Sequence, residues 1–69
     1  MERTAVQSSN IASIGYNQNT STLQIEFNSG RVYEYYDVPD EIHQGLVAAG
    51  SAGSYFHSQI KNSYAFQEI

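Results

Sequence analysis

Hydrophobic and polar residues alternate in three segments of the N-terminal half of the chain. The hydrophobic positions are Ala12, Ile14 and Tyr16 in the first segment, Leu23, Ile25 and Phe27 in the second, and Tyr33 and Tyr35 in the third. An alternation of period two with polar partners is typical of strands that are covered on one face only. We therefore predict three antiparallel strands that share one buried face.

The segments between these strands predict their register. Residues 18–21 can join the first two strands and place Tyr16 opposite Leu23. Asn28-Ser29-Gly30 is typical of a three-residue hairpin loop in which the glycine is left-handed. This loop length places Ile25 opposite Tyr33, whereas a slip of one residue would turn the hydrophobic side of one strand to solvent.

The second half of the chain predicts two helices. Pro39 ends the sheet and suits a first helical turn, with Asp40 and Glu41 following where acidic residues favour a helix N-terminus. The hydrophobic stripe of this helix is Ile42, Leu46, Val47 and Ala49, and Gly50 is its expected C-terminal cap. Gly45 either lets the helix approach the sheet closely or is a tolerated weakness.

Ser51 is the expected N-cap of a second helix that runs roughly from Ala52 to Asn62. Tyr55, Phe56 and Ile60 form its buried stripe, followed by a tail that can pack back on the core. The predicted fold class is α+β: a three-stranded antiparallel meander covered on one face by two short helices, in the order β-β-β-α-α.

The length and composition indicate one small domain. With 69 residues and no cysteine, the chain has neither a disulfide framework nor a thiolate metal site. We expect residues 8–69 to form the domain and residues 1–7 to be disordered or loosely ordered. The sequence has no secretory leader and no apolar run of about 20 residues, so we expect a cytoplasmic protein without a membrane segment.

Charge is distributed unevenly along the chain. The formal net charge is −4, but residues 42–67 contain no acidic residue and include His43, His57 and Lys61. The acidic total argues against binding to duplex DNA, which requires several phosphates to be neutralised by Lys and Arg. The acid-free half remains compatible with one small anion.

A set of ordered motifs carries a family resemblance. The motifs are Gly15-Tyr16, the Leu23/Ile25/Phe27 strand, Tyr33-x-Tyr35-x-x-Val38-Pro39, and Ser51-x-Gly53-x-Tyr55-Phe56. This pattern resembles the KTSC domain, a small bacterial and phage module that occurs alone and at the C-terminus of some lysyl-tRNA synthetases. The resemblance extends from Ser8 to Tyr64. It implies the fold, and the link to a synthetase suggests RNA binding.

Several residues are candidates for ligand binding. Tyr33 and Tyr35 can act as a stacking platform for bases, although the register favours a core role for both, as it does for Val38, Pro39 and Phe56. Exposed N–H groups around Gly53 can attract an anion, or the segment is an ordinary capped turn. His57 and Lys61 share one helix face because they are four residues apart. The candidate ligand-binding residues are Arg31, Ser51, Gly53, Ser54, His57, Lys61 and Tyr16.

The sequence contains no pattern that predicts catalysis. His43 and His57 lack a third ligand at metal-site spacing, and no nucleophile elbow is present. We expect no metal, no cofactor and too little room within one chain for a pocket of about 300 Å³.

The leading hypothesis is therefore a small non-catalytic binding module for a nucleotide or a short single-stranded RNA at the helix layer. The alternative is a protein–protein interaction or assembly module, phage-encoded or bacterial. It would act as a homo-oligomer or with a protein partner, through a sheet edge at the first strand or through the apolar tail Tyr64-Ala65-Phe66.

Overall fold

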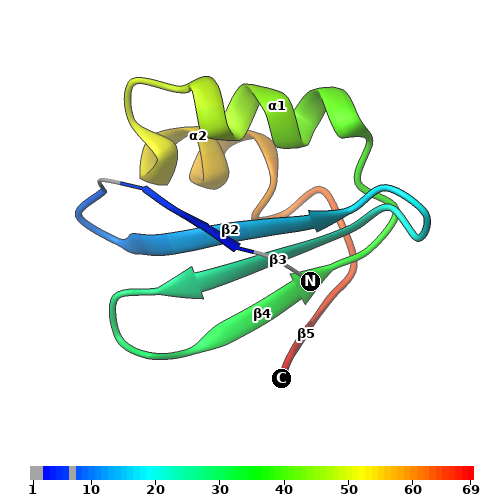
Figure 1. Ribbon diagram of the computed structural model, residues 1–69, viewed down its shortest axis with the longest axis horizontal. Helices are drawn as coiled ribbons and strands as arrows, with labels where there is room; N and C mark the ends of the chain where they lie inside the picture. The colour runs from blue at the N-terminus through cyan, green and yellow to red at the C-terminus, as the bar shows by residue number, and fades with distance from the viewer. Residues whose placement is uncertain (1–2, 7) are drawn as a thin grey trace.

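The chain folds into two layers, an antiparallel sheet and a pair of helices that cover one of its faces (Figure 1). The computed structural model describes residues 3–6 and 8–69. Its elements are β1 (Arg3–Ala5), β2 (Ile11–Asn17), β3 (Thr22–Phe27), β4 (Val32–Tyr35), α1 (Asp40–Ala48), α2 (Ala52–Gln59) and β5 (Phe66–Glu68). The α+β class is confirmed. The predicted number of three strands is wrong, since the sheet has five, in the order β1-β2-β3-β4-β5.

The three central strands have the predicted register. Tyr16 lies opposite Leu23 in the β2–β3 pair, and Ile25 lies opposite Tyr33 in the β3–β4 pair. In the hairpin, the Gly30 N–H donates to the Phe27 carbonyl oxygen at 2.9 Å, and Gly30 has a φ of 95°. The three-residue loop and its left-handed glycine are thus confirmed.

The two additional strands flank this meander. In β1, Thr4 lies opposite Ile14, and in β5, Phe66 lies opposite Tyr35. Residues 1, 2 and 7 of the segment expected to be loosely ordered lie outside the described residues, whereas Arg3–Ala5 forms β1. The expectation that the first alternating strand is a sheet edge is wrong, because β2 is paired with β1 on one side and with β3 on the other.

α2 begins as predicted, whereas Pro39 is the extended N-cap of α1 and not part of its first turn, and both helices end differently from the prediction. The Ser51 side-chain oxygen accepts a hydrogen bond from the Ser54 N–H at 3.3 Å, which confirms the N-cap of α2. α1 ends with Ala49 in an extended conformation, and Gly50 is not left-handed, so the predicted glycine cap is wrong. α2 ends at Gln59, before the predicted end at Asn62, because Ile60 departs from helical geometry and a turn follows.

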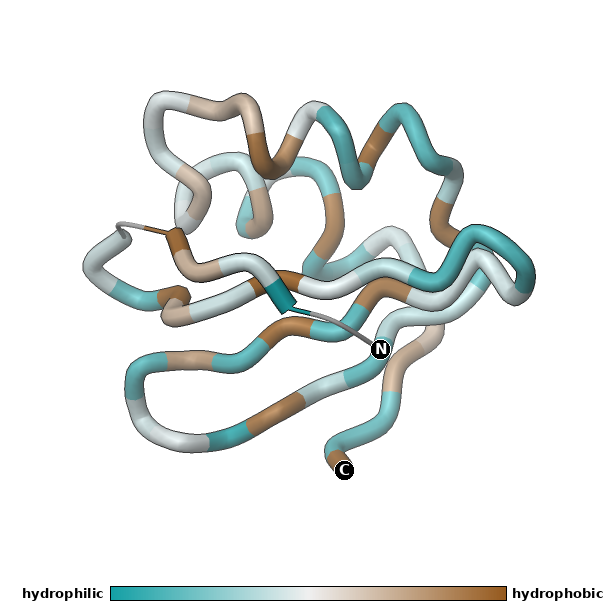
Figure 2. The backbone as a smooth tube through the Cα atoms, viewed as in Figure 1, coloured by the Kyte–Doolittle hydropathy of each residue, from teal (hydrophilic) through white to brown (hydrophobic). Residues whose placement is uncertain are grey.

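The core lies between the helices and the central strands, where hydrophobic positions recur along the tube in Figure 2. Its buried side chains include Tyr35, Val38 and Phe56, which belong to the family motifs. Pro39, which the sequence also assigns to the core, is exposed because it lies in the link that leads into α1. Val47, expected in the buried stripe, is 42% exposed.

Gly45 allows a close approach between the two helices rather than between helix and sheet. A Cβ atom built at this position would meet the hydroxyl of Tyr55 and would lie 2.7 Å from its Cζ atom. The ring of Tyr55, which packs against the core, therefore occupies the space that a side chain at residue 45 would need.

The turn at Gly30 gives a prediction about stability. A Cβ atom at Gly30 or at Gly50 would meet no atom within 4 Å, so the two sites differ in backbone conformation and not in space. Gly30→Ala is expected to lower the free energy of unfolding by roughly 1–2 kcal/mol, because an alanine resists the left-handed region. Gly50→Ala is the matched control and should be neutral or slightly stabilising. Urea denaturation of both variants measures the difference, and equal losses would contradict a left-handed requirement at Gly30.

Candidate functional site

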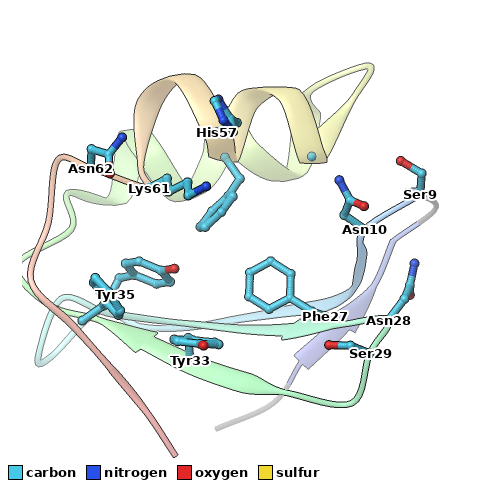
Figure 3. A pocket seen from close by; sticks show the side chains of 13 residues that line it. Ser9, Asn10, Phe27, Asn28, Ser29, Tyr33, Tyr35, His57, Lys61 and Asn62 are labelled. Carbon is cyan, nitrogen blue, oxygen red and sulfur yellow. The ribbon is translucent and has the colours of Figure 1, made fainter.

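An open groove of about 660 Å³ lies between α2 and the sheet (Figure 3). The expectation that one chain leaves too little room for a pocket is therefore wrong. The physical reason is the extent of the helix layer: the helices leave the β4–β5 side of the sheet partly uncovered, so Tyr33 is only partly buried and Phe66 is 54% exposed.

Aromatic side chains form the floor of the groove. We call Phe27, Tyr33, Tyr35, Phe56 and Phe66 the aromatic cluster. Three neighbouring strands, β3, β4 and β5, contribute Phe27, Tyr33, Tyr35 and Phe66, and α2 contributes Phe56 from the opposite side of the groove. Ring centroids of neighbouring members lie 5.4–6.5 Å apart, as in the edge-to-face pair of Phe27 and Phe56 at 5.4 Å. The sheet pairing explains the cluster, because directly opposite residues share a face.

The two tyrosines of the family motif differ in exposure. Tyr35 is 4% exposed and belongs to the core, whereas Tyr33 is half-buried and presents part of its ring to the groove. Burial, with a smaller contribution from neighbouring Tyr33, raises the pKa of Tyr35 to about 12. A tyrosine hydroxyl is protonated at neutral pH with either value, so the raised pKa reflects the burial of Tyr35 and does not change its charge at the groove.

Basic side chains stand at the helix side of the groove. His57 belongs to α2 and Lys61 to the turn that follows it, and both are exposed lining residues. Figure 3 shows the Lys61 side chain extending beneath the helix, above the strands that carry Tyr35. Among the described residues, those that line the groove include no Asp or Glu. The groove thus combines aromatic surface with the positive charge of Lys61, although Glu68 lies opposite Tyr33 at the sheet edge.

One end of the groove is polar and is built from two loops. Ser9 and Asn10 precede β2, and Asn28 and Ser29 belong to the hairpin between β3 and β4 (Figure 3). The loops are tied together, because the Asn28 N–H donates to the Asn10 carbonyl oxygen at 2.8 Å and the Asn28 side-chain amide donates to the Ser8 carbonyl oxygen at 3.1 Å. None of these four residues was predicted as part of a site, since Ser and Asn in loops carry no periodic signal.

The structure brings together only part of the predicted ligand-binding set. Gly53, His57 and Lys61 line the groove, together with Tyr33, Tyr35 and Phe56 of the motif residues. Arg31 is exposed next to the hairpin and is not a lining residue.

Three predicted residues have other local roles. Ser51 and Ser54 hydrogen-bond to each other within the cap of α2, their side-chain oxygens 3.1 Å apart. Tyr16 lies away from the groove, where its ring stacks on His43 with centroids 4.6 Å apart and its hydroxyl donates to the Val38 carbonyl oxygen. The Tyr16 ring thus helps to pack α1 on the covered face of the sheet.

The loop before β2 packs against the N-terminus of α2 and fills the space in which an anion was expected. A Cβ atom at Gly53 would lie 3.3 Å from the Ser8 hydroxyl oxygen and 3.5 Å from the Asn10 side-chain nitrogen. The glycine therefore makes room for the loop before β2. The space available to a ligand lies farther along the helix, above the aromatic cluster.

Two further features of the described residues limit the chemistry. No group of three or more His, Cys, Asp or Glu side chains in residues 3–6 and 8–69 is placed to hold a metal ion. Within the same residues, neither helix has the length and apolar character needed to cross a membrane.

Comparisons with known proteins agree on one family. Residues 7–64 match the family model described as the KTSC domain. The chain is 43% identical over 61 residues to an uncharacterized protein of Stutzerimonas stutzeri, a match that covers 88% of this chain and 86% of that protein. It is also 42% identical over 59 residues to a lysine–tRNA ligase of Nostoc punctiforme, covering 86% of this chain but only 10% of the ligase.

A solved structure extends the agreement to the fold. The crystal structure of a KTSC domain protein from Yersinia pestis matches with a TM-score of 0.96 and 37% sequence identity, covering 99% of this chain and 96% of that one. The family model and the solved structure lead to the same assignment, and this chain belongs to the KTSC domain family.

Proposed function

We propose that the protein is a non-catalytic binding module that holds a nucleotide or a short single-stranded RNA in the groove between α2 and the sheet. The observation that carries the proposal is the combination of partly exposed rings, Tyr33 and Phe66, with the basic side chains of His57 and Lys61. Proteins that bind single strands combine aromatic stacking with a positively charged groove, and each stacked base contributes about 1–3 kcal/mol.

An unpaired base fits this groove better than a duplex does. In an A-form helix the base faces are stacked on one another, so rings such as Tyr33 can reach only bases that are splayed out. With a net charge of −4, the protein also lacks the many cations that duplex binding requires. The homologous segment in a lysine–tRNA ligase, a protein whose name refers to tRNA, adds support for an RNA ligand.

The test is an amide-resonance NMR titration of the purified protein, first with mixed nucleotides and then with a short single-stranded RNA. We expect shifts at Tyr33, Tyr35, His57 and Lys61, and a dissociation constant that rises with salt. Lys61→Glu should weaken RNA binding about tenfold, or about 1.4 kcal/mol, by placing a negative charge beside the ligand.

Arg3→Glu is the matched control, because it changes the net charge equally and lies in β1, away from the groove. Circular dichroism of both variants checks that the fold is intact. No shifts with any nucleotide or RNA at low salt would overturn the proposal, and so would equal weakening by the two variants.

A protein-assembly role is the second candidate. The observation that favours it is the exposure of Phe66 and Ile69, at 54% and 55%, along the β5 edge. Sedimentation equilibrium discriminates between the two roles. A stable dimer that Ile69→Ser dissociates would favour assembly, and a monomer at all concentrations would exclude self-association through this edge.

A further inference from the structure

The polar end of the groove has its own hydrogen-bonding chemistry. Within the described residues, no hydrogen bond involves the Asn10 side chain, so its amide offers both a donor and an acceptor. The Asn28 side-chain nitrogen is engaged by the Ser8 carbonyl oxygen, which leaves its amide oxygen as an acceptor. This end therefore presents two amide oxygens and one amide nitrogen.

These groups are complementary to one kind of base edge. An exocyclic amino group carries two hydrogens and can donate to two carbonyl oxygens, while a ring nitrogen beside it accepts from an amide N–H. Adenine has this arrangement, and a side-chain amide paired with its N6 and N7 atoms is a common mode of adenine recognition. Unpaired cytosine also has an amino group beside a ring nitrogen, whereas uracil has no amino group and guanine presents the acceptor O6 beside N7. Adenine is preferred over cytosine here because its two fused rings offer more surface for stacking beside Phe27.

The position of these amide groups relative to the aromatic rings also favours adenine recognition. Figure 3 shows Asn10 and Asn28 at one end of the groove, with Phe27 between them and Tyr35, and with Lys61 and Asn62 farther along. A base stacked beside Phe27 would thus have its edge at the asparagines and its phosphate directed toward Lys61. The polar end is also fixed in place, because hydrogen bonds join the two loops.

We infer that Asn10, assisted by Asn28, selects an unpaired adenine in the groove. The inference rests on the proposed function, since it assigns the base specificity of the same site. It predicts that the 6-amino group of adenine is recognised and that Asn10 is the residue on which this recognition depends.

The test uses two short uridine oligonucleotides that differ at one central position, which carries either adenosine or purine riboside. The two bases have the same ring system and differ by the 6-amino group, so a difference in affinity reports on that group alone. We expect the adenosine oligonucleotide to bind about fivefold more tightly or better. Asn10→Ala should remove this preference. It should weaken the adenosine oligonucleotide more than the purine riboside oligonucleotide, because purine riboside keeps the ring nitrogen that accepts from the amide N–H but lacks the amino group.

Asn62→Ala is the control, because Asn62 lines the other end of the groove and should leave the preference intact. Equal binding of both oligonucleotides by the unmodified protein would overturn the adenine inference and leave the proposed function standing. A preference that survives Asn10→Ala in a folded variant would also overturn it. Failure of both oligonucleotides to bind would overturn the proposed function and the inference together.

Discussion

Replacing Phe56 with alanine is expected to lower the free energy of unfolding by about 3–5 kcal/mol and to leave the domain largely unfolded. The ring is 8% exposed and packs edge-on against Phe27 and Tyr35, at centroid distances of 5.4 and 5.5 Å. Phe56 is therefore the contact that joins α2 to the aromatic side of the sheet. A domain of 69 residues has a total stability of only several kcal/mol, so the loss is comparable with the whole.

Circular dichroism and the dispersion of amide resonances measure this outcome directly. Phe66→Ala is the matched control, because it removes a ring of the same cluster that is 54% exposed and should cost about 1 kcal/mol or less. A Phe56→Ala variant that remains folded with a loss as small as that of the control would show that α2 is held by other contacts.

Gly45→Val is expected to lower the free energy of unfolding by roughly 1–3 kcal/mol through overpacking between the helices. The added Cβ would compete for space with the Tyr55 side chain, whose Cζ atom would lie 2.7 Å away. Helix propensity works in the opposite direction, because valine is a better helix former than glycine. A measured loss therefore reports on packing.

A double-mutant cycle isolates this contact. In a Tyr55→Ala background the space at residue 45 is open, so Gly45→Val should then be neutral or stabilising. Thermal and urea denaturation of the four proteins give the coupling energy. An equal loss in both backgrounds would mean that the valine acts on something other than the Tyr55 ring.

The central strands were predictable because their determinants are local. Alternation assigns the buried face of Ile14 and Ile25, and a three-residue loop then sets Tyr33 opposite Ile25. β1 and β5 have three residues each, too few to show a period, and become strands by pairing with β2 and β4. Local sequence also fails to predict which glycine is left-handed: both Gly30 and Gly50 follow an element, but only Gly30 of the two has a positive φ.

The candidate site was only partly predictable for the same reason. Phe27, Tyr33 and Tyr35 follow from the strand pattern, and His57 follows from the helix pattern. The prediction that Lys61 shares a helix face with His57 is wrong, because α2 ends at Gln59 and Lys61 lies in the turn that follows, although both residues line the groove. Asn10 and Asn28 meet through tertiary contacts between two loops that lie 18 positions apart in the sequence, so no local pattern indicates them. Tyr16 was a candidate ligand-binding residue, but its ring stacks on His43 of α1 and does not line the groove.

The short outer strands also affect how the domain behaves among copies of itself. An exposed strand edge is a template on which another chain can add hydrogen bonds, and the hazard grows with its length. Here the long strands β2 and β3 are paired on both sides, and the strands at the two edges have only three residues each. The domain thus offers little backbone for the addition of a strand from another chain.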